Sequence, residues 1–148
     1  MGRSRGGFSS KILITAADEN TAIAINVVPG QDHDAPHLEA LLDQTTARVP
    51  DIDQVVGDKG FDGQAQRQAC EARGARPVIP YRSTSTTRTR LNRKAYAERN
   101  MVERLFGKAK EFRRVATRYD KLKQVFLGMT HLALGFIRLR STVIVNRT

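Results

Sequence analysis

The sequence is short of cysteine, of long apolar runs and, in its second half, of acidic residues. Its single cysteine, Cys70, excludes an internal disulfide framework and a four-cysteine zinc site, and suits a reducing compartment. No apolar run approaches the roughly 18 residues of a transmembrane helix, and the N-terminus has no signal-peptide pattern. The sequence therefore predicts a soluble, cytoplasmic protein with no membrane partner, in which Cys70 is a small core residue.

The charge is divided unequally along the chain. Residues 1–74 hold 7 Lys/Arg and 11 Asp/Glu, whereas residues 75–148 hold 18 and 4, so the balances are −4 and +14. Such a surplus costs self-repulsion unless a polyanion relieves it. The C-terminal half is therefore expected to bind DNA or RNA, with a solvated basic face or a contact to ribosomal RNA as alternatives.

Alternation and turn signals place the expected elements. The 148 residues, 40% of them hydrophobic, fit one domain with a moderate core and show no internal repeat. Residues 1–10 are expected to be a mobile basic lead-in. The patterns predict strands at 11–16, 21–28, 52–57 and 76–80, and helices at 35–48, 64–73, 95–119 and 121–145. This order indicates a mixed α/β sheet with helices on its faces.

The helix expected over residues 95–119 carries two stripes. Four polar residues fall within about 60° of one another at 100° per residue: Tyr96, Arg99, Glu103 and Lys110. A neighbouring apolar stripe holds Val102, Leu105, Phe106, Ala109, Phe112 and Ala116. The helix can therefore bury one side and hold a polar constellation at the edge of what it buries.

Two carboxylates are candidate metal ligands. Asp58 follows an apolar strand at its carboxyl end, where α/β sheets bind ligands, and Glu103 lies on the later helix. Carboxylates that converge in one cleft suit Mg²⁺ or Mn²⁺ and phosphoryl transfer on DNA. Taken alone, a strand-end aspartate is more often a turn cap, and a helical glutamate is more often part of a surface ion pair.

The spacing of the polar stripe favours catalysis. Tyr96-x2-Arg99-x3-Glu103-x6-Lys110 resembles the signature around the catalytic glutamate of bacterial insertion-sequence transposases of the DDE type, in the insertion sequence 4 / insertion sequence 5 superfamily. Residues 58–62 (DKGFD) look like that family's second-aspartate motif. Further segments at 6–11, 29–34 and 112–121 also resemble the family, so the resemblance covers nearly all of the chain.

The resemblance implies an RNase H-like fold and a role for each matching residue. Asp58 is expected to be the second metal-binding carboxylate and Glu103 the third. Arg99 and Lys110 would hold phosphates beside the scissile bond, and Tyr96 would stack or hydrogen-bond there. Further DNA-binding candidates are Lys59, Arg113 and Arg114. Expected partners are DNA (the insertion-sequence ends and the target), an N-terminal transposase chain and further copies in an oligomer on DNA, at the bacterial nucleoid.

One feature of the family lacks a counterpart here. The family has a first aspartate on a strand upstream of residues 6–11, and Asp18, the earliest acid of this sequence, falls in the expected hairpin turn instead. The sequence therefore predicts the C-terminal part of a catalytic domain, without the first and central strand. Two neighbouring strands would then have unpaired edges, and the two-metal site would be incomplete.

Two functions remain open at this stage. In its complete form the domain would cut and join DNA with Mg²⁺ or Mn²⁺; alternatively, the chain is a catalytically deficient DNA-binding fragment that acts as a subunit, an inhibitor or a relic. Within the basic stretch 81–94, the absence of aromatic interleaving favours phosphate contact over base stacking, although a solvated loop is an alternative. The basic residues there are Arg82, Arg88, Arg90, Arg93 and Lys94.

Overall fold

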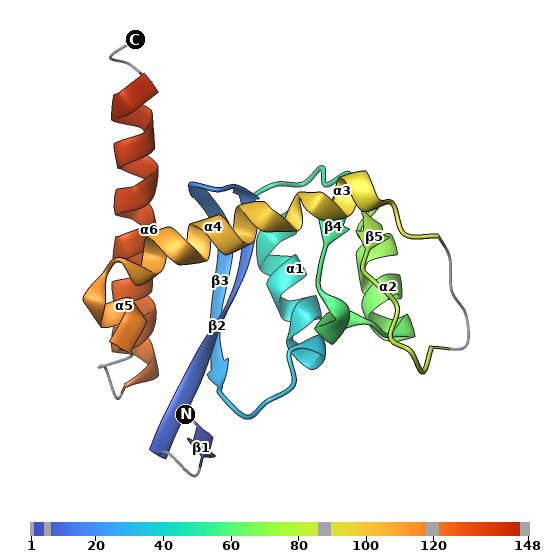
Figure 1. Cartoon of the computed structure of the whole chain (residues 1–148), viewed down its shortest axis with the longest axis horizontal. Coiled ribbons are helices and arrows are strands. Elements are labelled where there is room, and N and C mark those ends of the chain that lie inside the picture. Colours follow the sequence, from blue (N-terminus) through green and yellow to red (C-terminus); the bar gives the residue numbers. More distant parts are fainter. Residues whose placement is uncertain (1, 5–6, 86–89, 118–121, 146–148) are drawn as a thin grey trace. The chain divides into compact units, whose positions relative to one another are not determined.

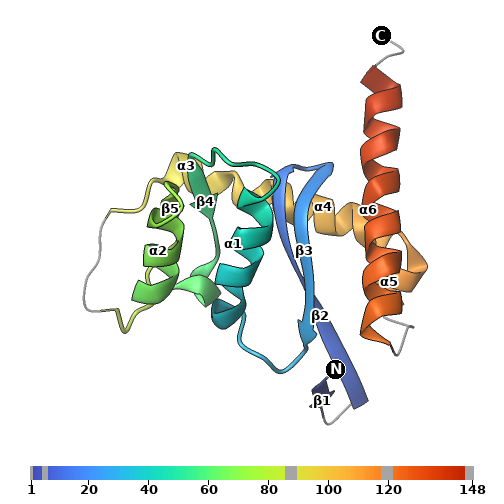
Figure 2. The same cartoon turned by 180° about the vertical axis from the view of Figure 1, so that it is seen from behind.

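A long antiparallel hairpin begins the chain (Figures 1 and 2). The structure is a computed structural model that describes residues 2–4, 7–85, 90–117 and 122–145. Strand β2, Gly7–Asp18, pairs with β3, Thr21–Pro29. The Asp18 carboxylate closes the turn, because it accepts hydrogen bonds from the Asn20 amide at 2.6 Å and the Thr21 hydroxyl at 2.9 Å. The predicted hairpin is confirmed.

Strand structure extends into the segment expected to be a lead-in. Strand β1, Gly2–Ser4, pairs antiparallel with the first residues of β2, in the sheet order β1-β2-β3. The expectation of a lead-in without regular structure at residues 1–10 is therefore wrong for residues 2–4 and 7–10. The reason is that β1 satisfies its backbone groups against β2 rather than against water.

The single helix predicted over residues 95–119 is also wrong, because the chain forms three helices there. These are α3, Arg93–Ala97, α4, Arg99–Lys110, and α5, Arg113–Thr117. A turn at Glu98 separates the first two. The amides of Glu111 and Phe112 then bond to carbonyls three residues back, at 3.2 Å, which tightens and ends α4. After this turn Val115, rather than Ala116, is buried.

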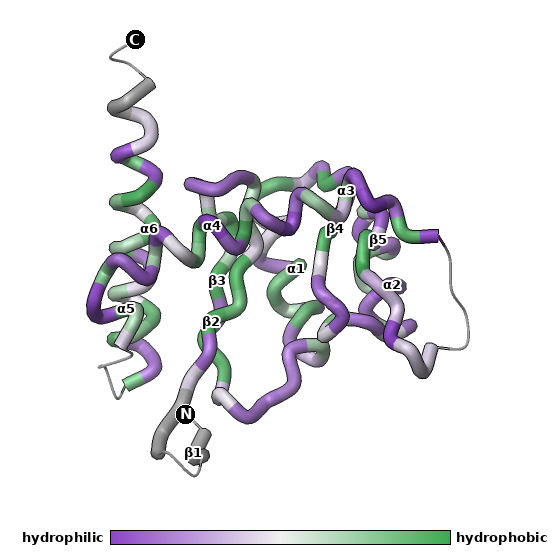
Figure 3. The backbone as a smooth tube through the Cα atoms, in the orientation of Figure 1, coloured by the Kyte–Doolittle hydropathy of each residue, from purple (hydrophilic) through white to green (hydrophobic). Residues whose placement is uncertain are grey.

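The final helix, α6, Lys123–Val145, buries only some of its apolar residues. Phe126, Ala133 and Ile137 are buried, whereas Leu132 and Leu139 are 67% and 66% exposed. Figure 3 shows hydrophobic stretches along much of this helix. Apolar residues occur on more than one side of α6. Because only one side packs against the unit, the apolar residues on the other sides are exposed to solvent.

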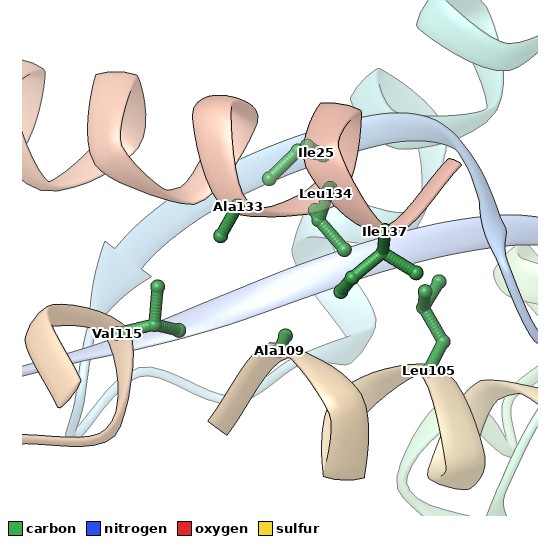
Figure 4. Packing of buried hydrophobic residues seen from close by; sticks show 7 residues of the cluster. All are labelled: Ile25, Leu105, Ala109, Val115, Ala133, Leu134 and Ile137. Atoms are coloured by element: carbon green, nitrogen blue, oxygen red, sulfur yellow. The ribbon is translucent and has the colours of Figure 1, made fainter. Parts of the chain in front are cut away.

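The chain divides into two compact units, one formed by residues 1–32 and 101–148 and the other by residues 33–100. In the first unit, β3, α4, α5 and α6 contribute to one apolar cluster (Figure 4). Its buried members are Ile25, Leu105, Ala109, Val115, Ala133, Leu134 and Ile137. Through Leu105 and Ala109, the cluster holds α4, which carries Glu103, within this unit.

The second unit alternates helices and short strands. In chain order they are the 3₁₀ helix η1, Ala35–His37, α1, Leu38–Thr46, β4, Gln54–Val56, the 3₁₀ helix η2, Lys59–Phe61, α2, Gln64–Glu71, β5, Arg76–Val78, and α3. Leu38, Leu42 and Cys70 form its buried cluster, so the prediction of a core cysteine is confirmed. Gly74, with φ of 75°, is the C′ residue that ends the α2 segment.

The strands form two sheets instead of the single mixed sheet that was expected. Strands β4 and β5 make a parallel pair in the second unit, and β1-β2-β3 make an antiparallel sheet in the first. Among the described residues, β4 pairs only with β5, and the 10–18 part of β2 pairs only with β3. The mixed α/β composition is confirmed. No helix within the described ranges is long and apolar enough to cross a bilayer.

Candidate active site

Asp58 lies two residues after the last residue of β4, at the carboxyl end of the parallel pair, where it was predicted. Its Oδ1 accepts a hydrogen bond from the Gly60 amide at 2.7 Å and its carbonyl accepts one from Phe61 at 3.1 Å. A Cβ at residue 60 would lie 2.7 Å from Asp58 Oδ1, so a larger residue there would displace this carboxylate oxygen. The turn-cap alternative is therefore observed, and the cap fixes the direction of the half-buried Asp58 carboxylate.

A second carboxylate of the same motif, Asp62, is the centre of a hydrogen-bond network. Its side chain is 5% exposed and accepts from Arg67 Nη2 at 2.8 Å, the Arg82 amide at 2.6 Å and the Ser85 hydroxyl at 2.6 Å. Burial acts to raise the Asp62 pKa, but the bonds from Ser85, Arg82 and Arg67 outweigh it and lower the pKa to about 2. Asp62 is therefore ionised at neutral pH.

The two arginines around Asp62 tie three segments together. Arg82 Nε donates to the Lys59 carbonyl at 3.0 Å, and its Nη2 donates to the Gly60 carbonyl at 2.9 Å. Arg67 also donates to the Ile79 carbonyl at 2.8 Å. The start of the basic stretch 81–94 is thereby fixed to the Asp58 turn. Arg88 lies outside the described residues.

Glu103 and Lys110 are exposed residues of α4, and Arg99 is the first residue of that helix. The spacing of these three on one helix agrees with the predicted stripe. Tyr96 belongs to α3 instead, yet the Arg99 guanidinium lies 5.8 Å from the centroid of its ring, so these two side chains are neighbours. The stripe is therefore split between two helices: Tyr96 lies beside Arg99, whereas Glu103 and Lys110 lie further along α4.

Glu19, in the β2–β3 turn, binds the outer face of α4. Its carboxylate lies 2.9 Å from Arg104 Nη1 and 3.2 Å from Lys108 Nζ, and Lys108 also donates to Asn20 Oδ1 at 2.7 Å. Hydrogen bonds from Arg104 and Lys108 hold the pKa of Glu19 below its usual range. These contacts fix α4 against the hairpin.

The remaining DNA-binding candidates are exposed. Lys59 lies in the 3₁₀ turn beside Asp58, and Arg113 and Arg114 form the first turn of α5. Arg114 Nη1 lies 3.8 Å from Met129 Sδ on α6, which orients that side chain. All three cations are accessible to a polyanion.

The structure places the two predicted metal ligands in different units, so their convergence stays a prediction. Within the residues that the structure describes, no group of three or more His, Cys, Asp or Glu side chains is close enough to hold a metal ion. The carboxylate oxygens of Asp58 and Glu103 are chemically suited to Mg²⁺ or Mn²⁺.

The sequence did not predict the network of Asp62, Arg67 and Arg82, and Arg82 was expected to contact phosphate rather than the Asp58 turn. Asp62 stands in the same DKGFD stretch as Asp58, which is the one signal that could have drawn attention to it. Nothing in local spacing could have linked Asp62 to Arg82 and Ser85, because these contacts form only when residues 81–85 fold back over the turn.

A strand-end aspartate, a helical glutamate flanked by cations and a basic C-terminal half are the features of a DNA-processing enzyme. Residues 55–140, which include Asp58 and Glu103, match the family described as Transposase DDE domain, and the chain belongs to this family. A relative from Brucella ovis, named "Putative transposase for insertion sequence element IS6501", is 30% identical over 122 residues, which are 80% of this chain and 88% of the relative. No solved structure is significantly similar to the chain.

Proposed function

We propose that this chain is the C-terminal catalytic part of an RNase H-like DDE transposase of the insertion sequence 4 / insertion sequence 5 superfamily, which moves an insertion sequence. The observation that carries the proposal is the placement of Asp58 at the end of β4 and of Glu103 on α4, both within the residues that match the transposase domain. The order of hairpin, helix, strand, helix, strand and helices supports the RNase H-like assignment.

Asp58 and Glu103 are proposed as the second and third carboxylates of the catalytic set. They would hold Mg²⁺ or Mn²⁺, which supplies activation of the attacking water or 3′-hydroxyl and stabilisation of the leaving oxygen in phosphoryl transfer. The cap from Gly60 holds Asp58 in one direction. The bonds of Arg104 and Lys108 to Glu19 hold α4, and with it Glu103, against the hairpin.

The exposed cations next to these carboxylates are proposed to hold the DNA backbone. Arg99 and Lys110 share α4 with Glu103 and would bind phosphates near the scissile bond, beside the Tyr96 ring. Lys59, Arg113 and Arg114 would extend this contact. Because phosphate contacts release counterions, binding would weaken steeply with salt.

Asp18 is not proposed as the first carboxylate. Both of its oxygens accept hydrogen bonds inside the hairpin turn, from Asn20 and Thr21. Burial acts to raise the Asp18 pKa, but these bonds outweigh it and keep the pKa below its usual value. We therefore propose that the first aspartate and its strand come from an N-terminal transposase chain, and that the active assembly is an oligomer on DNA.

A strand-transfer assay tests the proposal. Terminal-repeat DNA is incubated with the chain and an N-terminal transposase segment, with Mg²⁺ or without it. Metal-dependent nicking and joining is expected, and Asp58→Asn or Glu103→Gln should each lower the rate at least about 100-fold. Asp53→Asn, an exposed aspartate just before β4, and Glu111→Gln, just after α4, are the matched controls and should retain activity.

The alternative is a catalytically deficient DNA-binding fragment. It is favoured by the lack of a three-ligand cluster among the described residues and by the balance of +14 in residues 75–148. This alternative expects salt-dependent DNA binding with no cleavage in the same assay, even when the N-terminal segment is added. Cleavage that survives Asp58→Asn would contradict both functions.

A further inference from the structure

The turn that carries Asp58 is held from outside by one guanidinium group. Arg82 donates through Nε to the carbonyl of Lys59 at 3.0 Å and through Nη2 to the carbonyl of Gly60 at 2.9 Å. Gly60 in turn donates its amide to Asp58 Oδ1 at 2.7 Å. A planar guanidinium with two fixed donors is suited to hold two successive carbonyls at once, which a lysine ammonium does less well.

Arg82 is itself anchored by Asp62. The Arg82 amide donates to Asp62 Oδ2 at 2.6 Å, and the same oxygen accepts from the Ser85 hydroxyl at 2.6 Å. Asp62 Oδ1 accepts from Arg67 Nη2 at 2.8 Å. Hydrogen bonds connect Asp58 to Gly60, Gly60 to Arg82, and Arg82 to Asp62. The backbone of residues 58–62 closes the circuit. We call this closed circuit the Asp62–Arg82 brace.

The two aspartates of the DKGFD stretch have different surroundings. Asp62 is 5% exposed and accepts three hydrogen bonds, so its oxygens are occupied by the protein. Asp58 is half-buried, and its Oδ1 accepts a cap bond from Gly60. The environment therefore suits Asp58 to bind a cation and Asp62 to act as a structural anion.

We propose that Asp62 and Arg82 are positioning residues for Asp58, and that the brace holds the Asp58 turn in the conformation that presents its carboxylate to a divalent cation. This inference rests on the proposed metal-binding role of Asp58. Partners that orient a metal ligand from outside commonly change metal affinity about 10- to 100-fold when they are removed. Asp62 contributes through the orientation of Asp58 and does not itself bind the cation.

Mn²⁺ added to the isotope-labelled chain tests the proposal by paramagnetic broadening of backbone amide signals. In the wild type, Mn²⁺ should selectively broaden the amides of Asp58, Gly60 and Phe61, and Asp58→Asn should abolish this effect. Asp62→Asn and Arg82→Ala should each raise the Mn²⁺ concentration at half-broadening about 10-fold. Arg82→Lys should fall between Arg82→Ala and the wild type.

Matched controls come from pairs in the same unit. Asp43 accepts hydrogen bonds from Arg73, and Arg76 donates to Gln54 Oε1 at 3.1 Å, both outside the brace. Asp43→Asn and Arg76→Ala should therefore leave the Mn²⁺ response unchanged. Hydrogen exchange of the Gly60 amide, without metal, should become faster in Asp62→Asn and Arg82→Ala but not in the controls.

Three results would overturn the proposal. They are an unchanged Mn²⁺ response in folded Asp62→Asn and Arg82→Lys, a complete loss in Asp62→Asn equal to that in Asp58→Asn, and no selective broadening near Asp58 in the wild type. The second would make Asp62 a ligand. The readout is independent of DNA cutting, so a chain that shows the Mn²⁺ response but fails the strand-transfer assay would refute the transposition function alone.

Discussion

Glu19 accepts a hydrogen bond from Lys108 Nζ at 3.2 Å, and this contact ties the β2–β3 turn to the helix that carries Glu103. Arg104, one turn earlier on α4, lies 2.9 Å from the other oxygen of the same carboxylate. A single acidic side chain thus holds two cations of a helix in which basic residues predominate. Its neutralisation should loosen α4 rather than unfold the unit, because both pairs are at least partly exposed to solvent.

Glu19→Gln should lower the melting temperature slightly at pH 7 and have less effect in acid. The pKa of Glu19 is lowered in the folded state by its bonds to Arg104 and Lys108, so its contribution is present above the unfolded pKa, near 4.5, and is lost as the pH falls through the lower folded value. Thermal unfolding from pH 7 to pH 3.5 measures this. Glu71→Gln, an exposed glutamate on α2, is the control; an equal loss at every pH would contradict the prediction.

Asp62 should give the second unit an acid-sensitive stability. Its pKa falls from 3.8 to about 2 on folding, so its contribution is complete above pH 4 and disappears as the pH falls from about 4 to about 2. We expect this contribution to be on the order of 1 to 2 kcal/mol. Urea unfolding at several pH values should show the slope in the wild type and not in Asp62→Asn. A slope that persists in the variant would assign it to other carboxylates.

Cys70 should react with thiol reagents only when the second unit opens. The side chain is fully buried, and burial raises the pKa of its thiol to about 11. The folded chain therefore keeps this proton, and stability should decline as the pH rises from about 9 to about 11. Labelling at pH 8 should be slow in buffer and should follow unfolding in urea. Rapid labelling of the native chain would contradict the buried position.

Two apolar residues on α6 should respond very differently to truncation. Phe126 is fully buried, so Phe126→Ala should cost about 3 to 5 kcal/mol through lost burial and a residual cavity. Leu132 is 67% exposed, and Leu132→Ala should change the free energy of unfolding by less than ~0.5 kcal/mol. Urea unfolding monitored by circular dichroism measures both. A large loss in Leu132→Ala would show that this exposed side is covered in solution.

Local sequence patterns correctly predicted those elements that depend on residues close together in the sequence. The hairpin followed from alternation and a turn signal, and Asp58 at the end of a strand followed from apolar β-formers that precede an aspartate and a glycine. The break at Glu98 did not follow, because neither proline nor glycine marks it and residues on both sides are good helix formers. The choice of which side of α6 is buried also escaped prediction, since several sides are apolar.

The candidate site was predictable only in part, because some of its contacts join residues that are far apart in the sequence. Asp58, Glu103 and the cations near them belong to short motifs, so the sequence singled them out as candidates, and their roles stay predictions. The partners of Asp62 depend on residues 81–85, about 20 positions away along the chain, folding back over the turn. Glu19 and Arg104 are 85 residues apart in the sequence, so their pairing could not be predicted from local spacing either.

The two units of the chain can fold at different times during synthesis. The unit of residues 33–100 is one continuous segment, so it can complete its contacts as soon as it leaves the ribosome. The other unit joins residues 1–32 to residues 101–148, so the hairpin must wait for α4 and α6 before its apolar face is covered. Closing contacts over such separations is slow. The hairpin is therefore the part of the nascent chain with the longest exposure to chaperones and to mispairing.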